Sequence, residues 1–377
     1  TLFRSNGIKD LVNKADNKET EQDITIKDMN TKYTYSSDKY LTIKDQSGNS
    51  TNFNETSNNL ITLNKDSNSN SVYNYGSGSS IVGGTGNDKI INQASNVFID
   101  GNIGSDVIFN SGDNVTIKVT GGQNYIYNTG SNVSIIGSEE TDTIESYGDN
   151  VTVNVGSGSN NYVLISSNSN VTNNVSISSV AGGSNSIEGT DGNDIINVAD
   201  RNETAATRFY NAIDAGNGNN YIYNSNVERS TIWSGNGNDT IITGGGYYNS
   251  SSRVSICAGD GDNKITINSS MTSGRVYAGN GNDTVYGYYG HDKLFGEAGN
   301  DSLYGGYVND YIDGGYGNDA IYVNCGNNTV FGGAGNDSVS ITAGNNEVTG
   351  GLGNDTINIK TGNNIIHFKY LFNYILE

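Results

Sequence analysis

The feature that most constrains the fold is a short glycine-rich turn that recurs at a fixed spacing. From residue 278 to residue 367 the chain divides into ten consecutive nonapeptides, among them GGYGNDAIY, GGAGNDSVS and GGLGNDTIN. The sixth position is Asp or Asn in every copy, and the eighth is Val, Leu or Ile. The glycines permit a tight turn with positive φ, and the apolar residue lies in a short strand and points at a core. Each nonapeptide therefore predicts one turn followed by one strand.

Alternate copies differ at the sixth position, which indicates that the structural period is 18 residues. Odd copies carry aspartate: Asp283, Asp301, Asp319, Asp337 and Asp355. Even copies carry Asp292, Asp310, Asn328, Asn346 and Asn364. One coil then contains two strands and two turns, with one turn on each edge. Because stacked Asn amides can hydrogen-bond along a repeating ladder, we expect one metal-dependent edge and one edge held by an amide ladder.

The same period is present upstream and loosens in the middle of the chain. Two series step by 18 residues: Asp88, Asp106, Asn124, Asp142 and Asn160, and Asn96, Asn114, Asn132 and Asn150. Further on, Asp194, Asn220, Asp239, Asn263 and Asp283 are separated by 26, 19, 24 and 20 residues. Two of the larger gaps coincide with the stretches ADRNETAATRFYN and GGGYYNSSSR, which interrupt the opposite half-turn. Since insertions in solenoids map to loops on one face, the glycine-turn edge is predicted to run unbroken from Asp194 to Asp355.

These changes in regularity divide the chain into five predicted segments. Residues 1–50 form an N-terminal linker or cap, with a short helix expected near residues 8–18. Residues 51–188 form a solenoid with an Asn ladder, residues 189–277 a solenoid with loop insertions on one edge, and residues 278–367 the regular nonapeptide roll. The apolar residues 368–377 form a C-terminal cap. The predicted fold class is all-β, a right-handed parallel β-roll or β-helix solenoid.

Composition narrows the classes of partner. The net charge is −20, which argues against nucleic acid and anionic membranes and favours bound cations. No apolar run is long enough to span a membrane. Calcium takes six to eight oxygen ligands, and a GGxGND turn points backbone carbonyls and a carboxylate into one small space. One turn is insufficient, but two turns stacked one coil apart can hold an ion between them.

In these residues the chain resembles the hemolysin-type calcium-binding family, whose repeat-in-toxin (RTX) nonapeptide is matched by GGTGNDKII, GGYGNDAIY, GGAGNDSVS and GGLGNDTIN. The resemblance implies a β-roll secreted from bacteria that binds several Ca²⁺ ions and folds outside the cell. It assigns the best sites to the four intervals among Asp283, Asp301, Asp319, Asp337 and Asp355. It adds Asp292 with Asp310, although Val308 replaces a turn glycine there, and Asp88 with Asp106. Asp194 and Asp239 complete the set of candidate ligands, with weaker sites expected beside Asn220 and Asn263.

No enzyme is expected, because the sequence contains no HExxH, GxSxG or Walker motif and only two His. The predicted function is a calcium-binding extracellular structural or adhesive β-roll, part of a bacterial surface, filament or toxin-like protein. The alternative is a β-helix enzyme acting on polysaccharide, or the tail of such an enzyme. Partners other than calcium stay open between a cell-surface glycan, a protein and end-to-end self-association. The candidate binding residues are Arg229, Arg253, Trp233 and Tyr247, and local ion pairing with Glu203 and Glu228 is the competing interpretation of these arginines.

Overall fold

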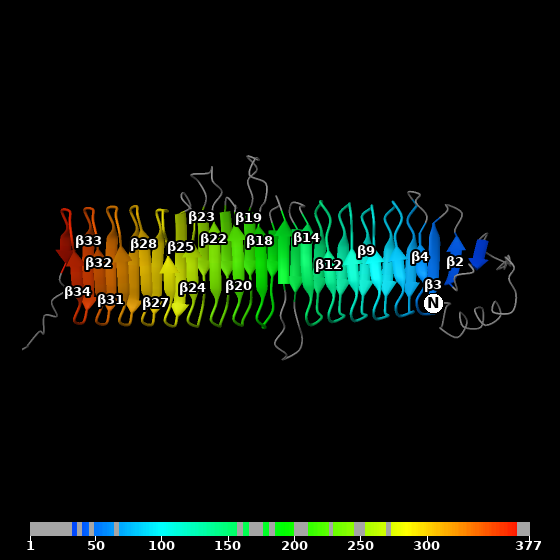
Figure 1. Cartoon of the computed structure of the whole chain (residues 1–377), viewed down its shortest axis with the longest axis horizontal. Coiled ribbons are helices and arrows are strands. Elements are labelled where there is room, and N and C mark those ends of the chain that lie inside the picture. The colour runs from blue at the N-terminus through cyan, green and yellow to red at the C-terminus, as the bar shows by residue number, and fades with distance from the viewer. Residues whose placement is uncertain are drawn as a thin grey trace, which may run out of the picture. The chain divides into compact units, whose positions relative to one another are not determined.

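A computed structural model describes residues 32–35, 40–44, 49–63, 68–156, 161–165, 176–180, 185–199, 210–225, 229–244, 253–268 and 273–367. In that part of the chain all regular structure is β-strand. It contains no helix of the length and apolar character that a membrane span requires. The chain separates into two compact units, residues 1–158 and residues 159–377, each of which is a stack of coils (Figure 1).

The first unit has strands in two sheets. One sheet contains Lys32–Tyr35 (β1), Tyr40–Lys44 (β2), Ser50–Asn54 (β3), Ser71–Asn74 (β5), Lys89–Asn92 (β7), Val107–Asn110 (β9), Tyr125–Asn128 (β11) and Thr143–Ser146 (β13). The other contains Leu60–Thr62 (β4), Ser80–Val82 (β6), Phe98–Asp100 (β8), Thr116–Lys118 (β10), Ser134–Ile136 (β12) and Thr152–Gly156 (β14). From β3 and β4 onward, neighbours within each sheet are parallel. The chain therefore alternates between the two sheets with every strand.

The second unit repeats this arrangement over more coils. Its first sheet contains Asn161–Ile165 (β15), Asn185–Glu188 (β17), Tyr210–Asp214 (β19), Arg229–Trp233 (β21), Arg253–Cys257 (β23), Ser273–Asn280 (β25), Lys293–Ala298 (β27), Tyr311–Tyr316 (β29), Thr329–Ala334 (β31), Glu347–Leu352 (β33) and Ile365–His367 (β35). Its second sheet contains Ser176–Val180 (β16), Ile195–Ala199 (β18), Tyr221–Ser225 (β20), Thr240–Gly244 (β22), Lys264–Ile267 (β24), Thr284–Tyr286 (β26), Ser302–Gly306 (β28), Ala320–Val323 (β30), Ser338–Ile341 (β32) and Thr356–Ile359 (β34). Neighbours in both sheets are again parallel.

The core of each unit is one line of aliphatic side chains per sheet. Strands are short and alternate between an inward and an outward residue, so each contributes one or two side chains to the space between the sheets. In the first unit Ile90, Ile108, Ile126 and Ile144 are fully buried, and in the second unit Val276, Leu294, Ile312 and Val330 occupy the equivalent place. These are the eighth-position residues and their upstream equivalents. The predicted parallel solenoid with two half-turns per coil is confirmed.

The register also follows the predicted spacing. In regular coils Tyr125 lies opposite Thr143, and Thr284 lies opposite Ser302. Where the sequence spacing loosens, pairing loosens by the same amount. Bonds between successive turns join residues 26, 19, 24 and 20 apart from Asp194 to Asp283. The extra residues therefore leave the strand pairing of the core intact.

The ends of the chain are partly outside the described residues. The helix expected near residues 8–18 and the cap expected at residues 368–377 both lie there. Within the predicted N-terminal segment, β1 pairs with β2 and β2 pairs with β3, both antiparallel. β2 thus covers the edge of β3, which would otherwise expose a row of unpaired backbone groups at the start of the solenoid.

Candidate metal centre

Glycine in the turns lets each coil lie directly on its neighbour. In the turn of Asp337, Gly333 and Gly335 have φ of 116° and 143°, a region that side-chain-bearing residues rarely occupy. A Cβ on Gly335 would collide with the carbonyl oxygen of Gly317 in the coil before it. The glycines are therefore required both by the bend and by the close approach, and they fix the position of the aspartate that follows.

The aspartates of the second unit form an unbroken ladder along one edge. At each step the backbone N–H of one sixth-position residue donates to Oδ1 of the equivalent residue in the next coil. The ladder runs from Asp194 through Asn220, Asp239 and Asn263 to Asp283, with N···Oδ1 distances of 2.7–2.9 Å. It continues through Asp301, Asp319, Asp337 and Asp355 at 2.8–3.1 Å. The predicted continuity of this edge from Asp194 to Asp355 is confirmed.

The opposite edge begins with carboxylates and ends with amides. Gly274 N–H donates to Asp292 at 2.6 Å, and the ladder continues through Asp310 to Asn328 at 3.0 and 2.7 Å. Beyond that point side chains bond to side chains. Nδ2 of Asn328 donates to Oδ1 of Asn346 at 2.9 Å, and Asn346 repeats this bond to Asn364 at 2.8 Å. The predicted amide ladder of these three residues is confirmed.

The second oxygen of most of these carboxylates is buried without a partner. Oδ2 has no hydrogen-bond partner in eight of the described aspartates: Asp106, Asp239, Asp283, Asp292, Asp301, Asp310, Asp319 and Asp337. All eight side chains are buried. An unpaired buried acceptor costs about 1–3 kcal/mol, and more when it is charged. A row of such atoms is unfavourable for the protein alone and calls for a ligand that supplies positive charge.

Burial also raises the pKa of these carboxyl groups, because it removes water from the charged form. The pKa is raised to about 6 in Asp283, about 7 in Asp301 and Asp319, and about 8 in Asp310. Repulsion from the neighbouring carboxylate adds to this in Asp301 and Asp310, while the backbone N–H bond to Oδ1 acts in the opposite direction. Burial likewise raises the pKa of Asp106, Asp239 and Asp292 to about 7.

The space beside these oxygens suits calcium. A Cβ on Gly287 would stand 2.6 Å from Asp292 Oδ2 and 2.7 Å from the carbonyl oxygen of Gly305, so a carboxylate and a carbonyl converge on a volume that only glycine leaves open. The described residues bring together no group of three Asp, Glu, His or Cys side chains. A site between two turns would therefore take two carboxylates and complete its coordination with backbone carbonyls. An all-oxygen donor set of this kind fits Ca²⁺ better than a transition metal.

The first unit places Asp88 and Asp106 in a shorter ladder. Asp88 N–H donates to Asp106 at 2.8 Å, and Asp106 N–H donates to Asn124 at 2.9 Å. Asp106 leaves Oδ2 without a partner, whereas Oδ2 of Asp88 accepts the N–H of Gly84 at 2.7 Å. Asp194 in the second unit resembles Asp88, since its Oδ2 accepts the N–H of Thr190 at 2.7 Å. The eleven predicted aspartates are therefore not equivalent.

Sequence reasoning missed the main polar ladder of the first unit. Buried Asn side chains donate to one another along Asn54, Asn74, Asn92, Asn110 and Asn128, with Nδ2···Oδ1 distances of 2.6–2.7 Å, and Ser146 ends the row. The signal was present, because Asn92, Asn110 and Asn128 repeat every 18 residues, four residues after the Asp88 series. The series that was singled out, from Asn96 to Asn150, instead occupies the left-handed corners of turns, with φ of 54–61°.

The candidate binding residues lie on neighbouring strands of one sheet. Arg229 of β21 lies opposite Arg253 of β23, and its guanidinium is 5.9 Å from the ring centroid of Tyr210 on β19. Trp233, at the end of β21, is 44% exposed. Tyr247 lies outside the described residues, as do Glu203 and Glu228, the predicted ion-pair partners of the arginines. The structure therefore brings two arginines and an exposed tryptophan to one face.

Comparison with protein families agrees with this geometry. The family model described as RTX calcium-binding nonapeptide repeat (4 copies) matches residues 82–117, 181–199, 229–247, 274–303, 304–339 and 342–366. The matched segments contain all eleven predicted aspartates. Comparisons with curated proteins and with solved structures found no match. The repeats between residues 82 and 366 are RTX calcium-binding nonapeptides, and the chain is an RTX-type calcium-binding β-roll.

Proposed function

We propose that this chain is an extracellular structural or adhesive module of a bacterial surface, filament or toxin-like protein, and that calcium completes its fold. The observation that carries the proposal is the row of buried carboxylate oxygens without partners, seven of which lie in the second unit. Such a row makes the ion-free fold costly and the ion-bound fold favourable. Calcium is thus a folding ligand for this chain, which has no assigned catalytic role.

The proposed ions lie between successive turns. The strongest sites are the four intervals of the run from Asp283 to Asp355, where every turn provides a carboxylate. The pair Asp292 and Asp310 provides a further site on the other edge, and Asp106 with Asp88 provides one in the first unit. Asp239 has an Asn on both sides of it in the ladder, so its sites hold less negative charge and bind more weakly.

The proposed location follows from the affinity that such sites have. Modular calcium sites of extracellular proteins have Kd values of about 10⁻⁴–10⁻³ M. Ligand bound only by the folded form stabilises it in proportion to RT ln(1 + [L]/Kd), so an array of weak sites stabilises the fold outside the cell and leaves it unstable where calcium is scarce. The RTX character of the repeats supports this location.

A calcium titration of the intact chain tests the proposal. In chelator the far-ultraviolet circular dichroism should show reduced β-structure, and addition of Ca²⁺ should restore it with several ions bound per chain by equilibrium dialysis. Magnesium at the same concentration is the control, since it prefers a smaller, rigid octahedral site. A spectrum that does not respond to calcium, with no ion retained, would contradict the proposal.

An adhesive role is supported by the face that carries Arg229, Arg253 and Trp233. Two adjacent arginines in a chain of net charge −20 form a local positive surface, and the exposed indole beside them provides an apolar contact. We expect this face to bind an acidic glycan or an acidic protein surface. Replacement of Arg229 and Arg253 with Ala should weaken attachment to sulfated or uronic-acid glycans, and replacement with Lys should largely preserve it. Equal attachment by all three proteins would contradict this role.

A further inference from the structure

The peptide between the first and second residues of each aspartate turn takes one of two orientations. In three turns the N–H of the second residue donates to Oδ2 of the aspartate four residues later. These bonds run from Gly84, Ser138 and Thr190 to Asp88, Asp142 and Asp194, at 2.7, 2.6 and 2.7 Å. None of these three donors has positive φ. We call these turns closed, because the protein itself satisfies the carboxylate.

In the remaining turns the second residue has positive φ. For the eight aspartates whose Oδ2 lacks a partner, the second residues are Asn102, Gly235, Gly279, Tyr288, Glu297, Gly306, Gly315 and Gly333, with φ of 61–116°. The correspondence is complete among these eleven turns: positive φ accompanies an unpartnered oxygen, and its absence accompanies a bonded one. We call the turns with positive φ open.

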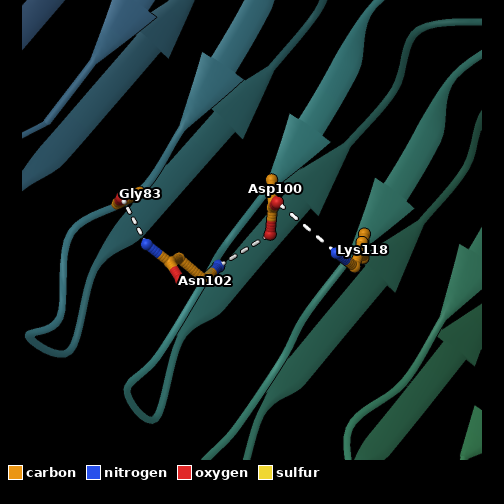
Figure 2. A network of polar contacts seen from close by, with 4 residues as sticks. All are labelled: Gly83, Asp100, Asn102 and Lys118. Carbon is orange, nitrogen blue, oxygen red and sulfur yellow. Dashed lines mark hydrogen bonds and ion pairs between the residues drawn. The ribbon is translucent and has the colours of Figure 1, made fainter.

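One rotation explains both observations. A peptide unit is planar, so turning it reverses its N–H and C=O together and changes φ of the residue that follows. In a closed turn the N–H faces the carboxylate and the carbonyl of the first residue faces away from it. Figure 2 shows this for Gly83, whose carbonyl accepts a bond of 3.3 Å from Nδ2 of Asn102. In an open turn the carbonyl faces inward, as Gly305 O does beside Asp292 Oδ2.

The second residue decides which orientation is stable. Thr is β-branched and Ser has a hydroxyl that competes for the carboxylate, and both features favour the closed turn. Thr190 Oγ1 donates to Asp194 Oδ1 at 3.0 Å, and Ser138 Oγ lies 3.3 Å from Asp142 Oδ1. Tyr288 and Glu297 keep positive φ although a left-handed residue with a Cβ costs about 1–2 kcal/mol. The open form is therefore maintained even against the preference of the residue.

We propose that the second residue of each turn determines whether its aspartate binds calcium, and that Ser138 and Thr190 replace the ion. This inference rests on the proposed calcium-binding function and refines it. Open turns offer the ion a free carboxylate oxygen together with a carbonyl. The turns of Asp142 and Asp194 are closed by a backbone N–H and a hydroxyl, and they need no calcium. Asp194 is thus set apart from the other predicted ligands, and Gly84 leaves the turn of Asp88 able to open.

The first test opens a closed turn in the full-length protein. Thr190→Gly removes the β-branch and the hydroxyl, and it should raise the number of Ca²⁺ ions retained in equilibrium dialysis by one. Thr190→Val has the same shape as Thr without the hydroxyl, still disfavours positive φ, and should retain the parent number. An unchanged count in Thr190→Gly, or an equal gain in Thr190→Val, would overturn the inference.

The reverse test closes an open turn. Glu297→Thr and Glu297→Asn remove the same charge, but Asn tolerates positive φ and Thr does not. Glu297→Thr should therefore retain fewer ions than Glu297→Asn, while both variants keep the circular dichroism of the calcium-bound protein. Equal ion counts in the two variants would overturn the inference. Failure of the parent to retain any calcium would instead contradict the proposed function, so the two failures are distinguishable.

Discussion

The two units build the same coil and satisfy its buried turns differently. In the first unit the described coils contain a row of buried Asn side chains that donate to and accept from one another, and one carboxylate oxygen, that of Asp106, lacks a partner. In the second unit seven such oxygens lack partners. An amide is both donor and acceptor, so a stack of amides is complete by itself. A carboxylate only accepts, so a stack of carboxylates needs a cation.

The difference implies that two kinds of stability coexist in one chain. The first unit relies on apolar side chains and amide ladders, whose contribution is constant. The second unit adds a term that grows with calcium concentration. The comparison also applies within the second unit, because its edge with Asn328, Asn346 and Asn364 is closed by amides while the edge with Asp319, Asp337 and Asp355 is not.

The largest expected effect is the loss of the regular roll on removal of calcium. Each site filled at 100 times its Kd contributes about 2.7 kcal/mol, so the loss of several sites exceeds the stability of a typical domain. Hydrogen exchange of the intact chain in chelator should show loss of amide protection across residues 278–367. Residues 84–146 should keep most of theirs. Equal loss in both segments would remove the distinction between the units.

Replacement of Asp319 with Asn should have effects of opposite sign with and without calcium. Asp319 is in the middle of the ladder, so its loss weakens the sites on both sides and should lower the calcium-bound stability by about 2–5 kcal/mol. In chelator at pH 8 the variant should be more stable than the parent, because Asn removes a buried charge and its amide can donate to the turn as Asn263 does to Gly261. Thermal unfolding in both conditions measures this. A change of the same sign in both would argue against an ion at Asp319.

Replacement of Asn110 with Ala tests the amide ladder of the first unit. Asn110 accepts from Asn92 at 2.6 Å and donates to Asn128 at 2.7 Å, so its removal leaves a buried donor and a buried acceptor without these bonds. We expect a loss of about 1–3 kcal/mol in the free energy of unfolding of this unit. The loss should be the same in calcium and in chelator, as monitored by hydrogen exchange of residues 84–146. A loss that calcium reverses would show that this unit also depends on the ion.

Much of this architecture follows from periodicity alone. Because a parallel solenoid stacks equivalent residues, the intervals of 26, 19, 24 and 20 residues predict the pairing of the middle coils directly. The ladder of Asn328, Asn346 and Asn364 was predictable for the same reason. The buried row from Asn74 to Asn128 was missed because Asn at a strand end was interpreted as the start of a loop, although it repeats with the coil.

The orientation of the turn peptides was less accessible from sequence. Glycine at the second position permits both orientations, so Gly84 and Gly333 look identical in the sequence and differ in the structure. Tyr288 and Glu297 adopt a φ that their residue type disfavours, which no local rule predicts. The stacking of neighbouring coils determines these angles. In contrast, Thr190 carries a local signal in its β-branch and hydroxyl that a closer analysis of the second position would have found.

The smallest expected effect is a pH dependence whose sign depends on calcium. Without the ion, burial raises the pKa of Asp301 and Asp319 to about 7 from a usual value near 3.8, so the folded chain binds more protons than the unfolded chain. The stability of the ion-free second unit is therefore greatest below pH 4 and falls as the pH rises to about 7. Calcium binds the deprotonated carboxylates, so its affinity should rise over the same range, by about tenfold per pH unit for each proton displaced.

Thermal unfolding at pH 5, 6, 7 and 8 measures both slopes. In chelator the midpoint should fall with increasing pH, and in saturating calcium it should rise. The Asp319→Asn variant is the matched control, since it lacks one of the titrating groups and should show a smaller slope in both conditions. Parallel slopes with and without calcium would mean that the buried carboxylates are not the groups that exchange protons for the ion. Opposite slopes would link the unpartnered oxygens of the second unit, rather than its general acidity, to calcium binding.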